Sequence, residues 1–260
     1  MSNLPCGDTA TEAGWSDLVD ELDRWGAAGR VATMWWRDDD AVTATPQLDS
    51  LLHLARGVPV ALAVIPALAL PDLANALSGA PQVAVLQHGW QHVSHAGRGK
   101  KSEYPEGRSA AVVEAEIGAG RARLKALFGC RALPVFVPPW NRFAGKFAPL
   151  LRQRGIAVLS SMARAPAAAL PAGLAAIDVH LDVVAWRGDR GFVGTGAALA
   201  ALIGHLRAGR VGATRATVPV GILTHHRVMD GATATFLGRL VELTCAHAAV
   251  RWVSAAAFMR

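Results

Sequence analysis

Short apolar runs rich in β-branched residues alternate with longer alanine-rich amphipathic runs along the sequence, and this alternation limits the fold more than any other feature. The pattern predicts strands over residues 31–37, 59–65, 83–88, 133–138, 156–161, 175–184, 219–225 and 250–254. It predicts helices over residues 12–25, 46–56, 71–77, 109–128, 145–154, 195–207 and 232–246. Strands that alternate with helices are joined as parallel neighbours by right-handed crossovers. About seven to eight parallel strands favour an α/β barrel over an open doubly wound sheet.

The order of the predicted strands and helices indicates one barrel domain with a short N-terminal extension. No glycine-rich phosphate loop follows an early strand, which argues against a dinucleotide-binding fold. No linker is long enough to divide the strands between two domains. We expect residues 1–30 to form an N-terminal helical extension and residues 31–260 to form the (β/α) barrel. Residues 97–108, "GRGKKSEYPEGR", form the one long polar insertion and read as a solvated loop, with closure over a substrate as the alternative.

Composition excludes several classes of protein. Hydrophobic residues make up 52% and charged residues 18% of the 260 positions, which is typical of a globular chain. The net charge of +6 is spread without a run of basic residues, so we expect no nucleic-acid partner. The three cysteines form no closely spaced pair, and the N-terminus has no secretory signal pattern. We expect a soluble cytoplasmic protein without membrane insertion, and the oligomeric state is left open.

Polar side chains gather where the predicted strands end. In a parallel barrel, functional groups lie at the C-terminal ends of the strands. Five such ends carry candidates, in the segments Asp38-Asp39-Asp40, "QHGWQHVSH" with His88, His92 and His95, "PPWNR", "HLDVVAW" with Asp182 and Trp186, and "LTHH" with His225 and His226.

Taken together, these groups predict a metal site. An aspartate triplet alone is more often a turn or a helix N-cap, and an isolated histidine is more often structural. His88 and His92 are four residues apart, so on a helical turn both imidazoles would reach one ion. Two imidazoles and one carboxylate leave open metal positions, and a second aspartate beside them would act as a general base. The same ligand trio serves iron oxygenases, but a neighbouring acid–base pair favours hydrolysis.

The motifs "RDDDA", "HGWQH", "PPWN" and "LTHH", in this order, resemble those of the polysaccharide deacetylase family, also called the NodB-homology or carbohydrate esterase family 4 domain. The resemblance covers roughly residues 31–254. It implies a distorted (β/α) barrel and a divalent metal ion, with zinc expected. It also implies hydrolysis of an acetyl or similar acyl group from an N-acetylated sugar or a related amide.

The resemblance assigns a role to individual residues. It implies Asp39 as the base, His225 as the acid, and Asp40, His88 and His92 as the metal ligands. The pair Asp38-Asp39 stays open as an alternative to Asp39-Asp40. We expect a small-molecule or carbohydrate substrate to contact Trp90, Pro139, Trp140, Arg142, Asp182 and Trp186. The tryptophans could stack on sugar rings or simply pack at the barrel mouth.

The sequence also departs from the family pattern. Val137 stands where the family usually has the arginine that steadies the catalytic aspartate, and Arg142 or Arg37 is a candidate substitute. His95 and His226 are additional histidines that could replace one of the expected ones. Two further hypotheses therefore stand beside the deacetylase: a catalytically silent carbohydrate-binding domain on the same scaffold, and a metallohydrolase of another non-peptide carbon–nitrogen bond.

Overall fold

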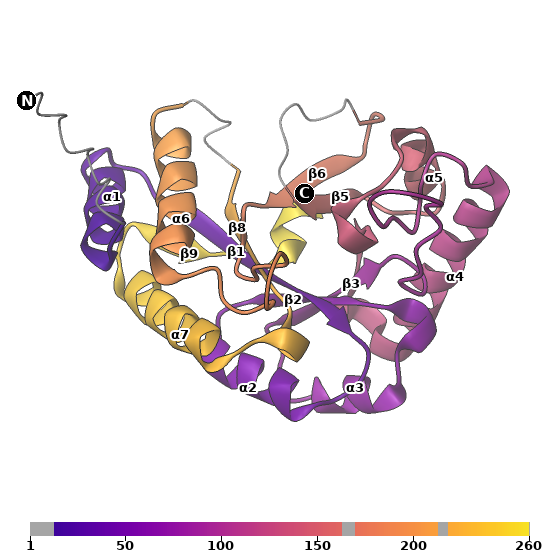
Figure 1. Cartoon of the computed structure of the whole chain (residues 1–260), viewed down its shortest axis with the longest axis horizontal. Coiled ribbons are helices and arrows are strands. Elements are labelled where there is room, and N and C mark those ends of the chain that lie inside the picture. The colour runs from indigo at the N-terminus through magenta and orange to yellow at the C-terminus, as the bar shows by residue number, and fades with distance from the viewer. Residues whose placement is uncertain (1–12, 163–169, 213–217, 260) are drawn as a thin grey trace, which may run out of the picture.

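The computed structural model describes residues 13–162, 170–212 and 218–259, and within them one sheet is wrapped by helices (Figure 1). The sheet contains the strands β1 (Ala32–Ala41), β2 (Val60–Val64), β3 (Val83–His88), β4 (Ala132–Val137), β5 (Val158–Met162), β6 (Ala175–Val179), β7 (Leu181–Asp182), β8 (Val220–Thr224) and β9 (Val250–Trp252). Their order is β6-β5-β4-β3-β2-β1-β8-β7, with β9 paired to β1, and every pairing between these strands is parallel. The predicted parallel α/β architecture is confirmed.

The sheet curls until its two ends nearly meet. β6 and β7 lie at opposite ends of the strand order but are consecutive in the chain, separated only by His180. The backbone N–H of His180 donates to Gly221 O of β8 at 2.7 Å, and Trp35 Nε1 of β1 donates to Asp178 O of β6 at 3.1 Å. A Cβ at Gly221 would lie 2.6 Å from Asp178 O, so only glycine allows this close approach. The predicted single strand 175–184 is therefore two strands, because the chain leaves β5 at His180 and joins β8.

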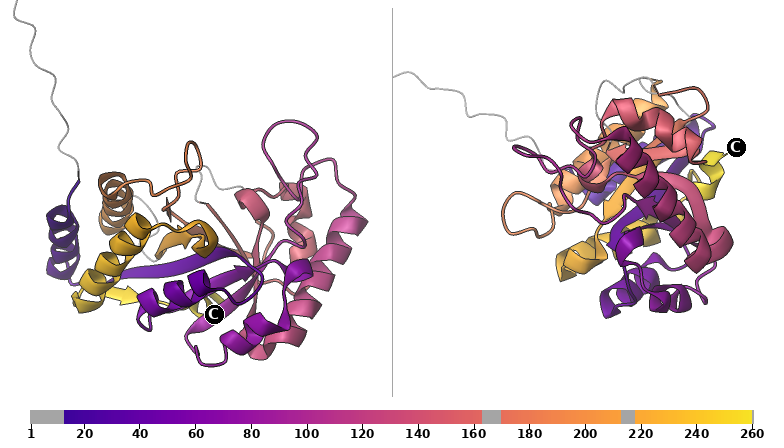
Figure 2. Two further views of the ribbon diagram at one scale, coloured as in Figure 1. Left: turned by 60° about the horizontal axis from the view of Figure 1, so that its bottom comes forward. Right: turned by 90° about the vertical axis from the view of Figure 1, so that its right-hand side faces the viewer.

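Helices cover the outside of the barrel (Figures 1 and 2). The α-helices are α1 (Trp15–Ala27), α2 (Pro46–Ala55), α3 (Pro71–Ala76), α4 (Ala110–Phe128), α5 (Ala148–Gln153), α6 (Thr195–Arg210) and α7 (Gly231–Ala246). Short 3₁₀ turns span Pro66–Leu68, Gly129–Arg131, Pro139–Asn141, Gly145–Phe147, His226–Val228 and Ala255–Met259. α1 packs against α6, where Trp25 Nε1 donates to Leu206 O and Arg210 pairs with the buried Glu21 at 2.7 Å. The division into residues 1–30 and 31–260 stays a prediction, and residues 1–12 lie outside the described part.

Side chains from nearly every strand fill the barrel interior. The interior cluster contains Trp35, Ala61, Ala63, Leu86, Val135, Val137, Val158, Ile177, Val179, Leu223 and Ala255. Trp36, the next residue after Trp35, belongs instead to a larger cluster between the sheet and the helices. The tandem tryptophans thus point to opposite faces of β1, as the two-residue period of a strand requires. Each indole buried in this way contributes about 4 kcal/mol of hydrophobic stabilisation.

None of the helices in the described ranges is both long and apolar enough to cross a lipid bilayer. The cytoplasmic location stays a prediction.

Candidate active site and metal centre

The end of β1 carries a β-bulge that separates the three aspartates. Asp38 pairs with Leu62 of β2 and Ala41 pairs with Val64, so β1 has one residue more than its partner over this span. Asp40 adopts a φ of 72°, in the left-handed region that aspartate tolerates better than most residues. The prediction that the strand stops at Arg37 is wrong: β1 runs to Ala41, and the bulge turns its last side chains in different directions.

Asp38 lies on the outer side of β1 and is fully buried. Its Oδ2 accepts hydrogen bonds from Thr224 Oγ1 at 2.6 Å and from the His226 N–H at 2.9 Å. Its Oδ1 lies 2.5 Å from His226 Nδ1. Asp38 and His226 therefore satisfy each other beneath the barrel mouth.

Asp39 lies on the inner side of β1 in an ion pair with Arg37, which is also fully buried. Arg37 Nη2 donates to Asp39 Oδ2 at 3.0 Å, and Arg37 Nε lies 2.9 Å from Asp39 Oδ1. The same guanidinium donates to Ser160 Oγ at 2.8 Å and to Asn141 Oδ1 at 2.7 Å. Of the two candidate substitutes for the arginine missing at Val137, Arg37 is the one that holds Asp39, because residues i and i+2 share a face of the strand.

Asp40 lies between His88 and His92. Its Oδ1 is 3.1 Å from His88 Nε2 and 3.3 Å from His92 Nε2, and three ligand atoms from these residues lie within 4.8 Å of one another. No other group of three such residues with this spacing occurs in the described part of the chain. The two histidines converge, but not on a helix: His88 ends β3 and His92 follows in a turn with a φ of 59°. The expected helical turn is wrong.

The hydrogen bonds of His88 prepare it to bind a cation. Val137 O lies 3.0 Å from His88 Nδ1, and a carbonyl only accepts, so Nδ1 carries a proton and Nε2 faces Asp40. Burial lowers the pKa of His88, but the charges of Asp39 and Asp40 outweigh burial and raise it. Burial also opposes ionisation of Asp40, yet His88, His92 and His225 lower its pKa far below the usual range. A divalent cation at this point would bind the carboxylate oxygen and both imidazole nitrogens together, so the residues fit a metal.

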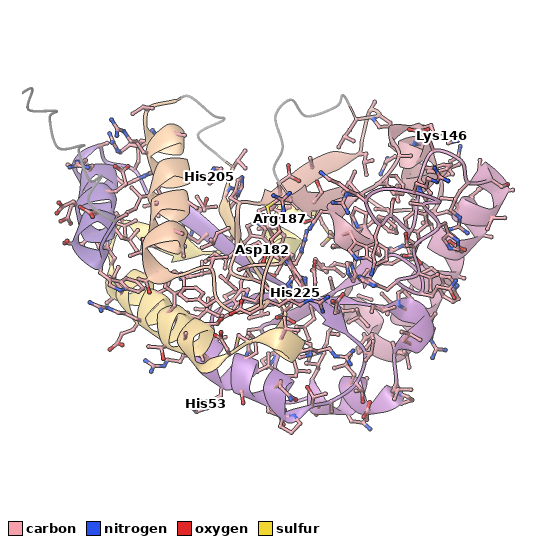
Figure 3. All side chains as sticks on the ribbon, viewed as in Figure 1. His53, Lys146, Asp182, Arg187, His205 and His225 are labelled. Carbon is pink, nitrogen blue, oxygen red and sulfur yellow. The ribbon has the colours of Figure 1, made fainter. Side chains whose placement is uncertain are left out.

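A second group of predicted residues lies around His225, which follows β8. Trp186 packs edge-on against His225 with ring centroids 4.7 Å apart, and Trp186 Nε1 donates to Asp182 Oδ2 at 2.7 Å. Figure 3 shows Asp182 and His225 together near the centre of the view, away from His53 and Lys146. His225 Nδ1 is buried and has no hydrogen-bond partner among the described residues. β8 runs parallel to β1, with Thr224 paired to Asp38, so His225 lies on the same edge of the barrel as the proposed ligands.

The remaining predicted residues lie in two loops beside His92. Trp140 packs against His92 with ring centroids 4.3 Å apart and has a left-handed φ of 56°. Pro139 is buried against Gly89, Trp90 is half-buried, and Arg142 donates to Lys101 O at 2.8 Å. Contact of these side chains with a substrate stays a prediction.

Sequence reasoning missed three residues that hold the site. Ser160 and Asn141 fix Arg37, and Glu103 accepts hydrogen bonds from the backbone of the turn that carries His92. Only Asn141 carried a signal, since it belongs to the "PPWN" motif. Burial raises the pKa of Glu103 despite these hydrogen bonds.

A groove lies elsewhere, on the outside of the barrel between α2 and α7. Its volume is about 920 Å³, and none of the predicted site residues lines it.

Comparison with solved structures places this geometry on a known scaffold. A protein from Mycobacterium smegmatis, provisionally assigned as a polysaccharide deacetylase, superposes with a TM-score of 0.67 at 17% identity, over 89% of this chain and 90% of that one. The chain has the polysaccharide deacetylase fold. A second provisionally assigned polysaccharide deacetylase, from Pseudomonas aeruginosa PAO1, gives a TM-score of 0.62 at 16% identity over 91% and 92% of the two chains. A family 4 carbohydrate esterase from Streptomyces lividans, solved with acetate, gives 0.53 at 16% identity over 84% and 90%.

Sequence comparison alone does not reach this scaffold, because no family model and no curated protein matches the chain. The polysaccharide deacetylase fold was nevertheless expected from four short motifs. At identities of 16–17% the similarity concerns the fold, and the chemistry rests on the residues of this chain.

Proposed function

We propose that the protein is a metal-dependent hydrolase that removes an acetyl or similar acyl group from an N-acetylated sugar or a related amide. The observation that carries this proposal is the convergence of Asp40, His88 and His92 beside Asp39, whose two carboxylate oxygens are held by Arg37. A carboxylate with fixed orientation next to three converging ligands is an arrangement suited to metal-assisted hydrolysis of an amide.

Asp40, His88 and His92 hold the ion, with zinc as the expected metal. When bound there, a divalent cation polarises the scissile carbonyl and acidifies water in the site. A cation bound there would account for the position of one carboxylate oxygen of Asp40 at 3.1 and 3.3 Å from two imidazole nitrogens.

The chain's own residues move the protons. Asp39 accepts a proton from the attacking water molecule, and the oxygen of that water forms a bond to the acyl carbon. His225 donates a proton to the nitrogen as the carbon–nitrogen bond breaks, so a free amine and a carboxylate leave. Trp186 fixes the plane of the His225 ring, and Asp182 in turn fixes Trp186. Each positioned acid or base is worth about a hundredfold to ten-thousandfold in rate.

Two observations bear on the competing hypotheses. The silent binding domain was suggested by the arginine missing at Val137, and the Arg37–Asp39 ion pair removes that reason. The acetate in the S. lividans family 4 esterase is consistent with acyl removal by this scaffold. Hydrolysis of another non-peptide carbon–nitrogen bond would use the same residues and remains the second candidate.

The test measures acetate release and metal content together. We expect the zinc-loaded protein to release acetate from small N-acetylated or O-acetylated sugars, and chelation by EDTA to abolish turnover. D39N and H225A should lower kcat by about a hundredfold or more while each variant keeps one zinc per chain. D49N and H95A, which change exposed residues outside the site, serve as matched controls and should turn over like the wild type.

Three results would contradict the proposal. The first is normal turnover by D39N or H225A. The second is wild-type protein that binds no divalent ion. The third is metal-loaded protein that binds N-acetylated sugars without releasing acetate, which would favour the silent binding domain.

A further inference from the structure

The middle of the insertion 97–108 is buried, although the sequence predicted a solvated loop. Ser102, Glu103 and Tyr104 are 7%, 0% and 0% exposed. Tyr104 packs among Phe136 and Phe143, with ring centroids 5.6 and 5.5 Å away. Ser102 O also accepts from the His95 N–H at 2.8 Å, so the insertion is fixed on both sides of Glu103.

The side chain of Glu103 lies beneath the turn that joins the two histidines. Its Oε2 accepts from the Trp90 N–H at 3.2 Å, and its Oε1 accepts from Gln91 at 2.8 Å and from His92 at 3.1 Å. Three consecutive N–H groups that converge on one carboxylate form an anion-binding nest. Within the described residues, no lysine or arginine side chain pairs with this carboxylate.

We propose that Glu103 is the positioning residue of the metal site, which holds the turn of residues 89–92 in the shape that brings His92 to Asp40 before any metal binds. The inference rests on the proposed function, since it assigns a second layer to that same site. Glu103 touches neither substrate nor ion. It acts through the backbone of His92.

The backbone of the turn explains why such a support is needed. Gly89 and His92 adopt φ values of 56° and 59°, and a non-glycine residue pays a conformational cost in this region. The hydrogen bond from the His92 N–H to Glu103 offsets that cost at the residue that must reach the ion. A Cβ at Gly89 would collide with Glu103 Oε2 and lie 2.7 Å from Pro139, so Gly89 and Glu103 are matched to each other.

The decisive variant is E103Q, which keeps the size of the side chain. A carboxylate offers only acceptors, whereas an amide turns one of them into a donor that faces the N–H groups. We expect the Kd for zinc to rise about 10–100-fold, the usual range for a group that orients a metal ligand. At saturating zinc, kcat should return to within about threefold of the wild type, since Asp39 and His225 are untouched. E106Q is the matched control, because Glu106 lies in the same insertion with a side chain that is 74% exposed.

A purely structural role predicts a different result. E103Q would then lower the melting temperature of the metal-free protein while leaving its zinc affinity unchanged, and this outcome would overturn the inference. A loss of kcat that excess zinc fails to restore would overturn it as well.

A second measurement needs no variant and therefore survives a failure of E103Q to fold. In the metal-free wild type, the amides of Trp90, Gln91 and His92 should exchange with deuterium at least about tenfold more slowly than exposed amides of residues 97–100. Equal exchange rates would overturn the inference. A wild type that binds no metal would overturn the proposed function, while the exchange of these amides would still report whether Glu103 holds the turn.

Discussion

The end of β1 carries two groups of aspartate and histidine side chains, one fully buried and one partly exposed. Asp38 and His226 lie on the outer side of the strand with side chains 0% and 1% exposed, and both oxygens of Asp38 have donors. Asp40, His88 and His92 lie at the mouth, where the side chains of Asp40 and His92 are 29% and 23% exposed. There a single oxygen serves two imidazoles.

The difference lies in how many donors each carboxylate has. Asp38 accepts from a hydroxyl, a backbone N–H and an imidazole, so nothing more is needed to bury its charge. In contrast, one oxygen of Asp40 contacts both His88 and His92, and a cation would supply the positive charge that this oxygen lacks. An aspartate close to a histidine is therefore not enough to identify metal ligands. The better sign is a partly exposed carboxylate that lacks a full set of hydrogen-bond donors.

The largest expected effect comes from D40N, which removes one ligand and keeps the shape. Zinc content should fall from about one to below roughly 0.1 per chain, and turnover should fall by about a thousandfold or more, because Lewis-acid stabilisation is worth several kcal/mol. The free energy of unfolding of the metal-free protein should fall by about 2 kcal/mol near neutral pH, because the lowered pKa of Asp40 means that the fold stabilises its ionised form and an amide loses that stabilisation. Metal analysis, acetate release and urea unfolding check these three values. If D40N still bound one zinc per chain, Asp40 would not be a metal ligand, and the contrast with the Asp38–His226 group would fail.

The fold was accessible from the sequence because the two periodicities that define it are local. β3 was predicted with its observed bounds, and α4 differs from its prediction by one residue at its start. β1 and the 175–184 segment differ from their predicted bounds because their ends depend on neighbouring strands. The bulge at Asp40 is defined by the pairing of β1 with β2, and the break at His180 arises where the barrel nearly closes.

The site was partly accessible for the same reason. The spacing of His88 and His92 indicated a shared ion, and the family resemblance added Asp40. The spacing also suggested a helical turn, where the structure has a strand end and a left-handed residue. Arg37 was one of two candidates to hold Asp39, and only the strand geometry distinguishes it from Arg142. Glu103 gave no signal, because a charged residue in a polar insertion is normally solvated and its burial depends on Tyr104 packing far along the chain.

An intermediate effect is expected for R37K, which tests the ion pair between Arg37 and Asp39. Asp39 stands between Asp38 and Asp40 in the sequence. Lysine keeps the positive charge but lacks the fork that contacts both oxygens of Asp39 and also reaches Ser160 and Asn141. We expect kcat to fall about 10–100-fold, with the zinc Kd within about threefold of the wild type. R123K is the control, because Arg123 binds two backbone carbonyls, those of Pro66 and Ala69, away from the aspartates. An unchanged kcat in R37K would remove Arg37 from the support of the base.

The smallest effect on turnover is expected for D38N, although its effect on folding is large. The amide loses part of three hydrogen bonds in a fully buried position, so the free energy of unfolding should fall by about 3 kcal/mol in urea titrations. The folded fraction should still bind one zinc and turn over within about threefold of the wild type, because Asp38 faces Thr224 and His226 rather than the mouth. D72N, which alters an exposed aspartate bonded to Thr43, controls for the change of charge. If D38N instead lost activity as completely as D39N while staying folded, the base–ligand pair would be Asp38-Asp39, and the outer group would be the functional one.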